Sequence, residues 1–221
     1  MRLVLPRLYV ILDATLLTIT ERECARQLVD AGVRLLQYRD KRASSGQLLE
    51  SAKRLSGDLQ PRDVTFIVND RSDVAALSGA SGVHVGQEDL SVEDARAVVG
   101  QNGLVGVSTH NRAQFEQAAG SSADYIAVGP IFSTSSKANA DPVVGTEFIR
   151  EVRPLTDKPI VAIGGITLER AREVVRAGAD AVAVIGDILR APDPGQRARQ
   201  FIGILEEANH APRVPKDILR K

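Results

Sequence analysis

The chain has 221 residues, 43% of them hydrophobic, which is enough for one domain with a sizeable core. Its 28 basic and 28 acidic residues balance, so no whole-chain field favours nucleic acid or an anionic membrane as a partner. A single cysteine excludes an intrachain disulfide and, with no apolar stretch as long as a membrane span, favours the cytoplasm.

Eight short apolar segments recur along the chain. They span residues 8–13, 33–39, 64–69, 82–86, 104–108, 124–129, 159–164 and 180–186. Each is almost entirely apolar rather than alternating, which is typical of parallel strands that are buried on both faces.

The segments between these strands have the end signals of helices. Side chains at capping positions predict helix starts at Thr20 with Glu23, Ser44 with Gln47, Ser91 with Asp94, and at Asn111 and Thr167 alone. Glycines with the left-handed conformation that stops a helix are predicted at Gly32, Gly57, Gly79, Gly100, Gly120 and Gly178. Cys24 falls on the apolar face of the first helix and is interpreted as a buried structural thiol.

Eight strands that alternate with helices in a chain of this length predict an α/β fold, a single (β/α)8 TIM barrel over residues 1–208. The alternative is an open, doubly wound sheet. Residues 209–221 are predicted to form a polar C-terminal tail that is loosely attached.

In such a barrel the active site lies at the carboxyl ends of the strands. Gln37, Arg39 and Lys41 alternate after the second strand, so they point the same way if the strand extends that far, and they form a candidate anion clamp. The alternative is a solvated basic loop paired with Asp40.

Asp70 and Asp89 follow the adjacent third and fourth strands. Two carboxylates brought together repel each other unless a cation joins them, and Mg²⁺ prefers such oxygen ligands. The pair therefore predicts a magnesium site. Taken singly, each residue also fits a structural role, Asp70 as a helix cap and Asp89 in a surface turn.

Strands seven and eight end in Gly164-Gly165 and Ile185-Gly186, where barrels of this class often bind phosphate through backbone N–H groups. His84 is interpreted as a satisfied core residue, as are Tyr9 and Tyr125. His110 lies near the predicted mouth, where it fits a catalytic base or a loop-orienting residue equally well.

These strand ends together resemble the thiamine phosphate synthase family over about residues 8–205. The phrases that show the resemblance are QYRDK, IVNDR, GVHVGQEDL, GVSTHN, ADYIAVGPIF followed by STSSK, PIVAIGGI and AGADAVAVIGDI. The resemblance implies a transferase of thiamine biosynthesis that joins a pyrimidine diphosphate to a thiazole phosphate or its carboxylate, and releases pyrophosphate.

The resemblance also implies which residues bind each substrate. The pyrimidine-diphosphate site of the family matches Gln37, Tyr38, Arg39, Asp40, Lys41, Asn69, Ser108 and Lys137. The resemblance further implies one Mg²⁺ per subunit, held by Asp70 and Asp89. Its thiazole-phosphate contacts match Thr134, Ser135, Ser136, Gly165, Ile185 and Gly186. Ser136 replaces the threonine that is frequent in the family, which retains a hydroxyl group.

Arg39, Lys41 and Lys137 are the cations expected to stabilise the departing pyrophosphate, and no nucleophile–base pair is required. Two other functions are considered: a thiazole tautomerase-like isomerase, and a non-catalytic phosphate-ligand sensor on a barrel scaffold. The partners expected are small molecules, with homo-oligomerisation left open.

Overall fold

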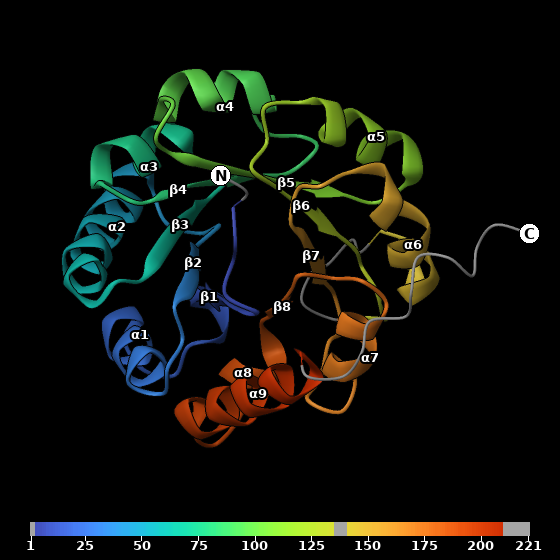
Figure 1. Cartoon of the computed structure of the whole chain (residues 1–221). Helices are drawn as coiled ribbons and strands as arrows, with labels where there is room; N and C mark the ends of the chain where they lie inside the picture. The colour runs from blue at the N-terminus through green and yellow to red at the C-terminus, as the bar shows by residue number, and fades with distance from the viewer. Residues whose placement is uncertain (1–2, 135–140, 210–221) are drawn as a thin grey trace, which may run out of the picture.

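The computed structural model describes residues 3–134 and 141–209. Eight parallel strands form a closed barrel in chain order, and β1 also pairs with β8 (Figure 1). The strands are β1 (Leu8–Asp13), β2 (Leu35–Arg39), β3 (Thr65–Asn69), β4 (Gly82–Val85), β5 (Leu104–Thr109), β6 (Tyr125–Val128), β7 (Ile160–Ile163) and β8 (Ala181–Val184). Because the first and last strands pair, the predicted (β/α)8 barrel is confirmed and the open sheet is excluded.

Helices surround the barrel on its outside (Figure 1). They are α1 (Glu21–Asp30), α2 (Ser45–Leu59), α3 (Ser72–Ser78), α4 (Val92–Val99), α5 (Arg112–Gly120), α6 (Gly145–Val152), α7 (Ala171–Arg176), α8 (Gly186–Leu189) and α9 (Pro194–Asn209). Single 3-10 turns occur at Ala14–Leu16, Gln60–Arg62 and Arg153–Leu155. None of the helices in the described ranges combines the length and the apolar character that a membrane span needs.

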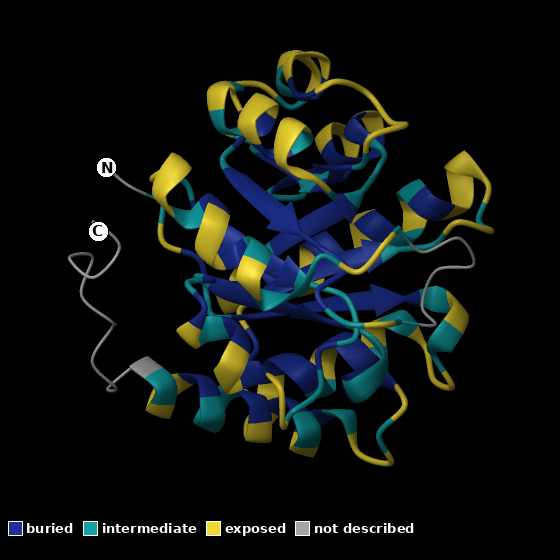
Figure 2. Ribbon diagram, turned by 90° about the vertical axis from the view of Figure 1, so that its right-hand side faces the viewer, coloured by how far each residue is buried: buried dark blue, intermediate teal, exposed yellow. Residues whose placement is uncertain are grey.

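The hydrophobic core has two layers, one on each side of the barrel wall. Outward-pointing side chains such as Leu36 and Val68 pack beneath the helices. Inward-pointing side chains such as Tyr9, Ile67 and Tyr125 fill the barrel itself. Figure 2 shows the barrel strands buried between helices whose outer faces are exposed. Burial on both faces explains why the strand sequences are apolar without alternation.

Most of the predicted helix starts are confirmed. Ser44 and Gln47 form a reciprocal capping box at the start of α2, and the side chains of Thr20, Ser91 and Asn111 each accept a backbone N–H at the start of their helices. The prediction for Thr167 is wrong. Helix α7 begins only at Ala171, without a side-chain cap.

The glycine predictions are confirmed in part. Four of the six glycines have positive φ angles, namely Gly32, Gly79, Gly100 and Gly178. Gly57 and Gly120 instead lie within α2 and α5. After α2 the chain adds a 3-10 turn, and Asp63, with φ of 60°, is the left-handed residue that ends it.

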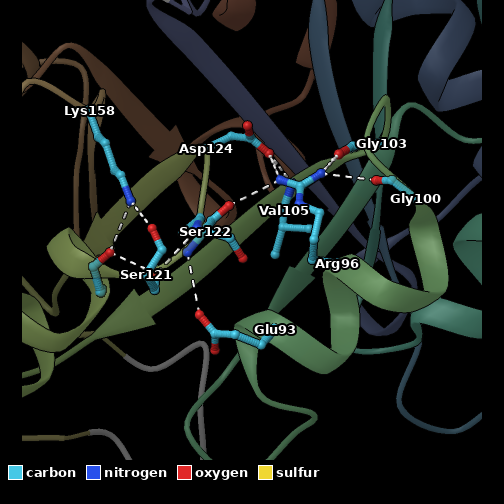
Figure 3. A network of polar contacts seen from close by, with 11 residues as sticks. Glu93, Arg96, Gly100, Gly103, Val105, Ser121, Ser122, Asp124 and Lys158 are labelled. Atoms are coloured by element: carbon cyan, nitrogen blue, oxygen red, sulfur yellow. Dashed lines mark hydrogen bonds and ion pairs between the residues drawn. The ribbon is translucent and has the colours of Figure 1, made fainter.

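At the amino-terminal end of the barrel, polar side chains fasten neighbouring strands together (Figure 3). Asp124, just before β6, accepts hydrogen bonds from the backbone N–H of Val105 in β5 (2.7 Å) and from the Arg96 guanidinium. Nearby, Lys158 donates to the Ser121 carbonyl at 2.5 Å, and burial lowers the pKa of its ammonium group. We call the contact between Asp124 and Val105 a strand clamp.

Two further strand clamps have the same position. Asp180, just before β8, accepts from the backbone N–H of Ile160 in β7 at 2.9 Å and from Arg153 at 2.5 Å. Ser81, just before β4, accepts from the N–H of Phe66 in β3 at 3.0 Å. In each case the residue that precedes an even-numbered strand binds an N–H near the start of the strand before it. The clamps therefore fix strand register at the end of the barrel opposite the predicted active site.

Candidate active site

Gln37 and Arg39 extend from β2 into the barrel. Gln37 is 2% exposed, and its Nε2 donates to the Tyr9 hydroxyl at 2.8 Å. The Arg39 guanidinium forms an ion pair with the buried Asp13 at the end of β1. Lys41 lies beyond the strand, with its Nζ 3.1 Å from an Asp70 carboxylate oxygen. The structure therefore brings Arg39 and Lys41 to the mouth, each already paired with a carboxylate.

The side chains of Tyr38 and Asp40 lie elsewhere. Tyr38 is buried in the outer layer of the core, beneath the helices. The Asp40 carboxylate accepts from the backbone N–H groups of Arg42 (2.9 Å) and Ala43 (3.1 Å). Neither side chain therefore joins the clamp, and the alternative in which Asp40 neutralises the basic loop is wrong, since Asp13 and Asp70 pair with its cations. The assignment of Tyr38 and Asp40 to the pyrimidine-diphosphate site stays a prediction.

Asp70 and Asp89 meet beyond the ends of β3 and β4. Burial and the neighbouring Asp89 carboxylate raise the pKa of Asp70, and Lys41 partly opposes this rise. Asp89 accepts the backbone N–H of Gly86 at 2.7 Å, which orients its carboxylate. The N–H of Asp70 donates to the His84 carbonyl at 2.8 Å, with Asp70 at φ of 62°, a conformation rare for a residue other than glycine.

This pair of carboxylates fits a divalent cation. Two carboxylates held side by side repel each other, and that repulsion is relieved when a cation binds between them. Across residues 3–134 and 141–209, no group of three or more His, Cys, Asp or Glu side chains that could hold a metal is found. Two carboxylates with the remaining ligands from water and substrate phosphate is a usual arrangement for Mg²⁺, so the donor set suits that ion.

Asn69 and Ser108 occupy inward-facing positions at the ends of β3 and β5. Asn69 follows the inward-facing Ile67 by two residues and lies in register with His84. Ser108 Oγ lies 2.9 Å from His84 Nε2. Both side chains therefore point into the barrel, near the mouth at the carboxyl ends of the strands.

His84, Tyr9 and Tyr125 are buried and hydrogen-bonded inside the barrel, which confirms their interpretation as core residues. His84 Nδ1 lies 3.1 Å from the Tyr125 hydroxyl, and the two rings stack with centroids 5.5 Å apart. The Tyr9 and Tyr125 hydroxyls are 3.0 Å apart. Burial raises the pKa of both tyrosines, so their hydroxyls stay protonated.

A cavity of about 360 Å³ opens at the carboxyl ends of β5 to β8. Its lining includes the predicted thiazole-phosphate residues Thr134, Gly165, Ile185 and Gly186. It also includes two cations, Arg170 and Arg190. Of the remaining predicted residues, Ser135, Ser136 and Lys137 lie outside the described ranges.

Gly165 has a structural reason to be glycine besides the approach of an anion. Its φ angle is +61°, and a Cβ there would lie 2.3 Å from the Ser133 carbonyl oxygen. The preceding Gly164 has φ of +99°, with its Cβ position 2.5 Å from Pro130. Side chains at either position would displace the segment after β6 that walls the cavity, so both glycines shape the cavity through packing.

His110 orients the cavity wall. Its Nδ1 lies 2.6 Å from the Gly129 carbonyl oxygen, and its Nε2 lies 3.4 Å from the Asp141 carboxylate. Its backbone N–H donates to Gln114 at 2.8 Å. Since Nδ1 holds a carbonyl and Nε2 faces a carboxylate, the geometry favours the loop-orienting role over the catalytic base.

Three charged residues of the site were not predicted from the sequence. Asp13 is the last residue of a correctly predicted strand, so its strand-end position was a usable signal. Arg170 lies with its guanidinium 4.6 Å above the Phe132 ring and donates to the Gly165 carbonyl at 3.1 Å. Arg170 and Arg190 follow their strands by several residues, so only the tertiary structure brings them to the cavity.

Known proteins are similar to this chain. The chain matches the family model described as thiamine monophosphate synthase over residues 8–188. It is 53% identical to a thiamine-phosphate synthase of Koribacter versatilis (strain Ellin345) over 208 residues, 91% of this chain and 96% of that protein. A second thiamine-phosphate synthase, from Shouchella clausii (strain KSM-K16), is 43% identical over 85% of this chain and 90% of its own length.

A solved structure agrees with these matches. Thiamine phosphate pyrophosphorylase from Pyrococcus furiosus superposes with a TM-score of 0.83 at 34% identity, covering 91% of this chain and 96% of that one. The family match covers the strand ends that form the mouth, from Asp13 in β1 to Gly186 after β8. The chain belongs to the thiamine monophosphate synthase family.

Proposed function

We propose that this chain is a thiamine-phosphate synthase, a transferase that joins 4-amino-2-methyl-5-(diphosphooxymethyl)pyrimidine to a thiazole phosphate and releases pyrophosphate. The observation that supports this most directly is the contact between Asp70 and Asp89 beside Lys41, at the mouth that also opens into the cavity lined by Arg190. Two anion-binding regions around one mouth suit a reaction between two phosphorylated substrates.

The pyrimidine diphosphate binds on the side of β2 to β5. Arg39 and Lys41 contact the diphosphate, and Asp70 and Asp89 hold one Mg²⁺, which when bound offsets the charge of the diphosphate oxygens. Gln37, Asn69 and Ser108 contact the pyrimidine ring from inward-facing positions. The ion pair with the buried Asp13 orients the Arg39 guanidinium toward the mouth.

The thiazole phosphate binds in the cavity at β5 to β8. Backbone N–H groups at Gly165 and Ile185-Gly186 contact the phosphate, and Arg170 and Arg190 add positive charge. Ser135 and Ser136, with Thr134, contribute hydroxyl groups. The carboxylate form of the thiazole needs one further cation or N–H donor, which either arginine can supply.

The reaction breaks the bond between the pyrimidine methylene carbon and the diphosphate oxygen, and that electron pair leaves with pyrophosphate. The electron-rich aminopyrimidine stabilises the positive charge left on the methylene carbon. The thiazole nitrogen then donates its lone pair to that carbon and forms thiamine phosphate. The residues act by orienting both substrates and by stabilising charge on pyrophosphate, so no protein nucleophile is needed.

Lys137 acts mainly on the transition state. Charge on pyrophosphate grows as the carbon–oxygen bond breaks, so a cation beside it gains interaction along the reaction coordinate. Lys137→Ala should lower kcat about a hundredfold, a typical cost for one preorganised charge contact, with little change in pyrimidine-diphosphate binding. An unchanged single-turnover rate with a higher KM would assign the lysine to substrate binding instead.

The deciding experiment incubates the purified chain with both substrates and Mg²⁺ and detects thiamine phosphate and pyrophosphate. The synthase forms both products in equal amounts. An isomerase converts the thiazole compound without the pyrimidine, and a phosphate-ligand sensor binds without turnover. Either of those results would contradict the proposal.

The location of the protein, its partners and its oligomeric state are also proposals. We propose a cytoplasmic enzyme whose partners are its small-molecule substrates, with homo-oligomerisation as an open alternative to a monomer. Fractionation of cells and sedimentation of the purified chain test these two points.

A further inference from the structure

A continuous series of polar side chains crosses the barrel interior below the mouth. It runs from Gln37 through Tyr9, Tyr125 and His84 to Ser108. The successive distances are 2.8, 3.0, 3.1 and 2.9 Å. We call this series the relay. Its first and last members are two of the three residues assigned above to the pyrimidine ring, and its three middle members have no role in the mechanism so far.

The hydrogen bonds of the relay have one direction. The Gln37 amide nitrogen can only donate, so the Tyr9 oxygen accepts from it. The single proton of the Tyr9 hydroxyl then points to its other partner, the Tyr125 oxygen. Tyr125, which already accepts from Tyr9, donates its own proton to His84 Nδ1.

The same direction continues to the other end of the relay. Because His84 Nδ1 accepts a proton from Tyr125, the ring carries its own proton on Nε2. His84 Nε2 therefore donates to Ser108 Oγ. The Ser108 hydroxyl accepts from His84, which leaves its proton available to a ligand at the mouth.

At the other end of the relay, Gln37 offers a hydrogen-bond acceptor, which complements the donor at Ser108. Its Nε2 is bound to Tyr9, and its Oε1 has no hydrogen-bond partner among the described residues. In that part of the chain, Ser72 Oγ is the buried side-chain polar atom that lacks a partner, so Gln37 Oε1 is not sealed from solvent. The relay thus presents an acceptor at Gln37 and a donor at Ser108.

The two ends are coupled. If the Gln37 amide turned over, Tyr9 would donate to it, every hydrogen bond of the relay would reverse, and Ser108 would become an acceptor. One substrate contact therefore determines the polarity of the other, although Gln37 and Ser108 lie on different strands, β2 and β5.

We propose that Tyr9, Tyr125 and His84 are positioning residues that hold Gln37 Oε1 as a hydrogen-bond acceptor and the Ser108 hydroxyl as a donor. This pair is complementary to a ring that offers one N–H donor and one nitrogen acceptor, as an aminopyrimidine does. The proposal rests on the assignment of Gln37 and Ser108 to the pyrimidine.

Packing alone does not account for the relay. The barrel interior around it is otherwise apolar, with Ile11, Ile67 and Val161 as neighbours in the same layer. Phenylalanine at Tyr125 would fill nearly the same volume without the cost of burying a hydroxyl. Gly106 also makes room for this ring, since a Cβ there would lie 2.0 Å from Tyr125 Cζ.

The test is Tyr125→Phe, which removes the central hydroxyl and separates the two ends. Affinity for the pyrimidine diphosphate with Mg²⁺ is measured by calorimetry, in parallel with its 4-oxo analogue, in which the amino donor becomes an acceptor. Wild type should prefer the amino compound by about tenfold or more, because the analogue mismatches both ends of the relay. Tyr125→Phe should lose most of that preference while thiazole-phosphate affinity stays unchanged.

A double-mutant cycle with Ser108→Ala separates positioning from stability. If Tyr125 holds both ends, Tyr125→Phe should cost clearly less pyrimidine affinity once Ser108 is alanine, because only the Gln37 end then remains to be lost. Equal losses in both backgrounds, or an unchanged amino-to-oxo ratio in Tyr125→Phe, would overturn the relay. A Ser108→Ala variant with normal pyrimidine affinity would instead overturn the subsite assignment on which the relay rests.

Tyr9→Phe is the second variant if Tyr125→Phe does not fold. It releases the Gln37 amide but leaves the hydrogen bonds of His84 to Tyr125 and Ser108 in place. The amino-to-oxo preference should fall because Gln37 Oε1 is no longer held as an acceptor. A preference equal to that of wild type would contradict the proposal.

Discussion

Arg190 lies at the cavity rim, and its guanidinium has no hydrogen bond or ion pair within the described ranges. A cation without a protein partner is available to a phosphate, and a charge-assisted contact of this kind contributes about 1.5–3 kcal/mol. Arg190→Ala should therefore raise KM for thiazole phosphate at least tenfold and leave pyrimidine-diphosphate binding unchanged. Arg199→Ala on α9 is the control, because Arg199 is exposed and absent from the cavity lining. Equal effects of the two variants would remove Arg190 from the site.

The buried thiol of Cys24 should make the stability of the fold depend on pH. Burial raises the pKa of its thiol to about 11 from 9.0. The folded state therefore keeps the proton longer than the unfolded state as pH rises. The stability from this group is complete below pH 9 and is lost as pH rises from about 9 to about 11. Denaturant titrations should show a steeper loss of unfolding free energy across that range for wild type than for Cys24→Ala, and parallel curves would contradict the prediction.

The positions of candidate site residues could be predicted from the sequence where strand geometry alone determines them. Gln37, Asn69 and Ser108 follow inward-facing positions of predictable strands, and Asp70 and Asp89 follow neighbouring strand ends. Tyr38 is assigned to the site only through the resemblance, which covers a run of residues, although the alternation of side chains along the strand already turns it away from the mouth. Arg170 depends on its contacts with Phe132 and Gly165, which no local pattern encodes.

At the level of elements, all eight strands were predictable because burial on both faces leaves an apolar signal. The ends of the helices were harder to predict from the sequence. A cap is visible in the sequence when a side chain supplies it, as at Ser44, but α7 starts without one at Ala171. Gly57 was a misleading signal, since a glycine near the end of a helix is also tolerated inside it.

The strand clamps give a prediction for these elements. Asp180→Ala removes the acceptor for the Ile160 N–H and for Arg153, which leaves polar groups unpaired at the amino-terminal end of the barrel. The unfolding free energy should fall by about 1–3 kcal/mol. Steady-state kinetics should be unchanged because the clamp lies at the end opposite the mouth. Asp157→Ala, at an exposed position before β7, is the control, and a similar loss there would contradict the role of the clamp.

For the molecule as a whole, the two proposed substrate regions lie on different parts of the same mouth. Asp70 and Asp89 follow β3 and β4, whereas the cavity lies at β5 to β8. Binding of pyrimidine diphosphate should therefore depend strongly on Mg²⁺, and binding of thiazole phosphate should not. Calorimetry of each substrate with Mg²⁺ or with excess chelator measures this difference.

Asp70→Asn and Asp89→Asn provide the matched variants. Each should raise the Mg²⁺ concentration needed for turnover and lower turnover sharply at saturating metal, with thiazole-phosphate affinity preserved. Full activity of both variants in excess chelator would show that these carboxylates hold no metal.

The ion pair between Asp13 and Arg39 has a consequence for the substrate's ionic form. When ionised, the described side chains on this side of the mouth provide three carboxylates, Asp13, Asp70 and Asp89, against two cations, Arg39 and Lys41, which leaves one excess negative charge. Lys137, proposed beside the diphosphate, would only balance that excess, whereas a divalent cation makes the region net positive. We therefore expect the magnesium complex of the pyrimidine diphosphate to be the species that binds, and we expect released pyrophosphate to compete with it only while magnesium is present.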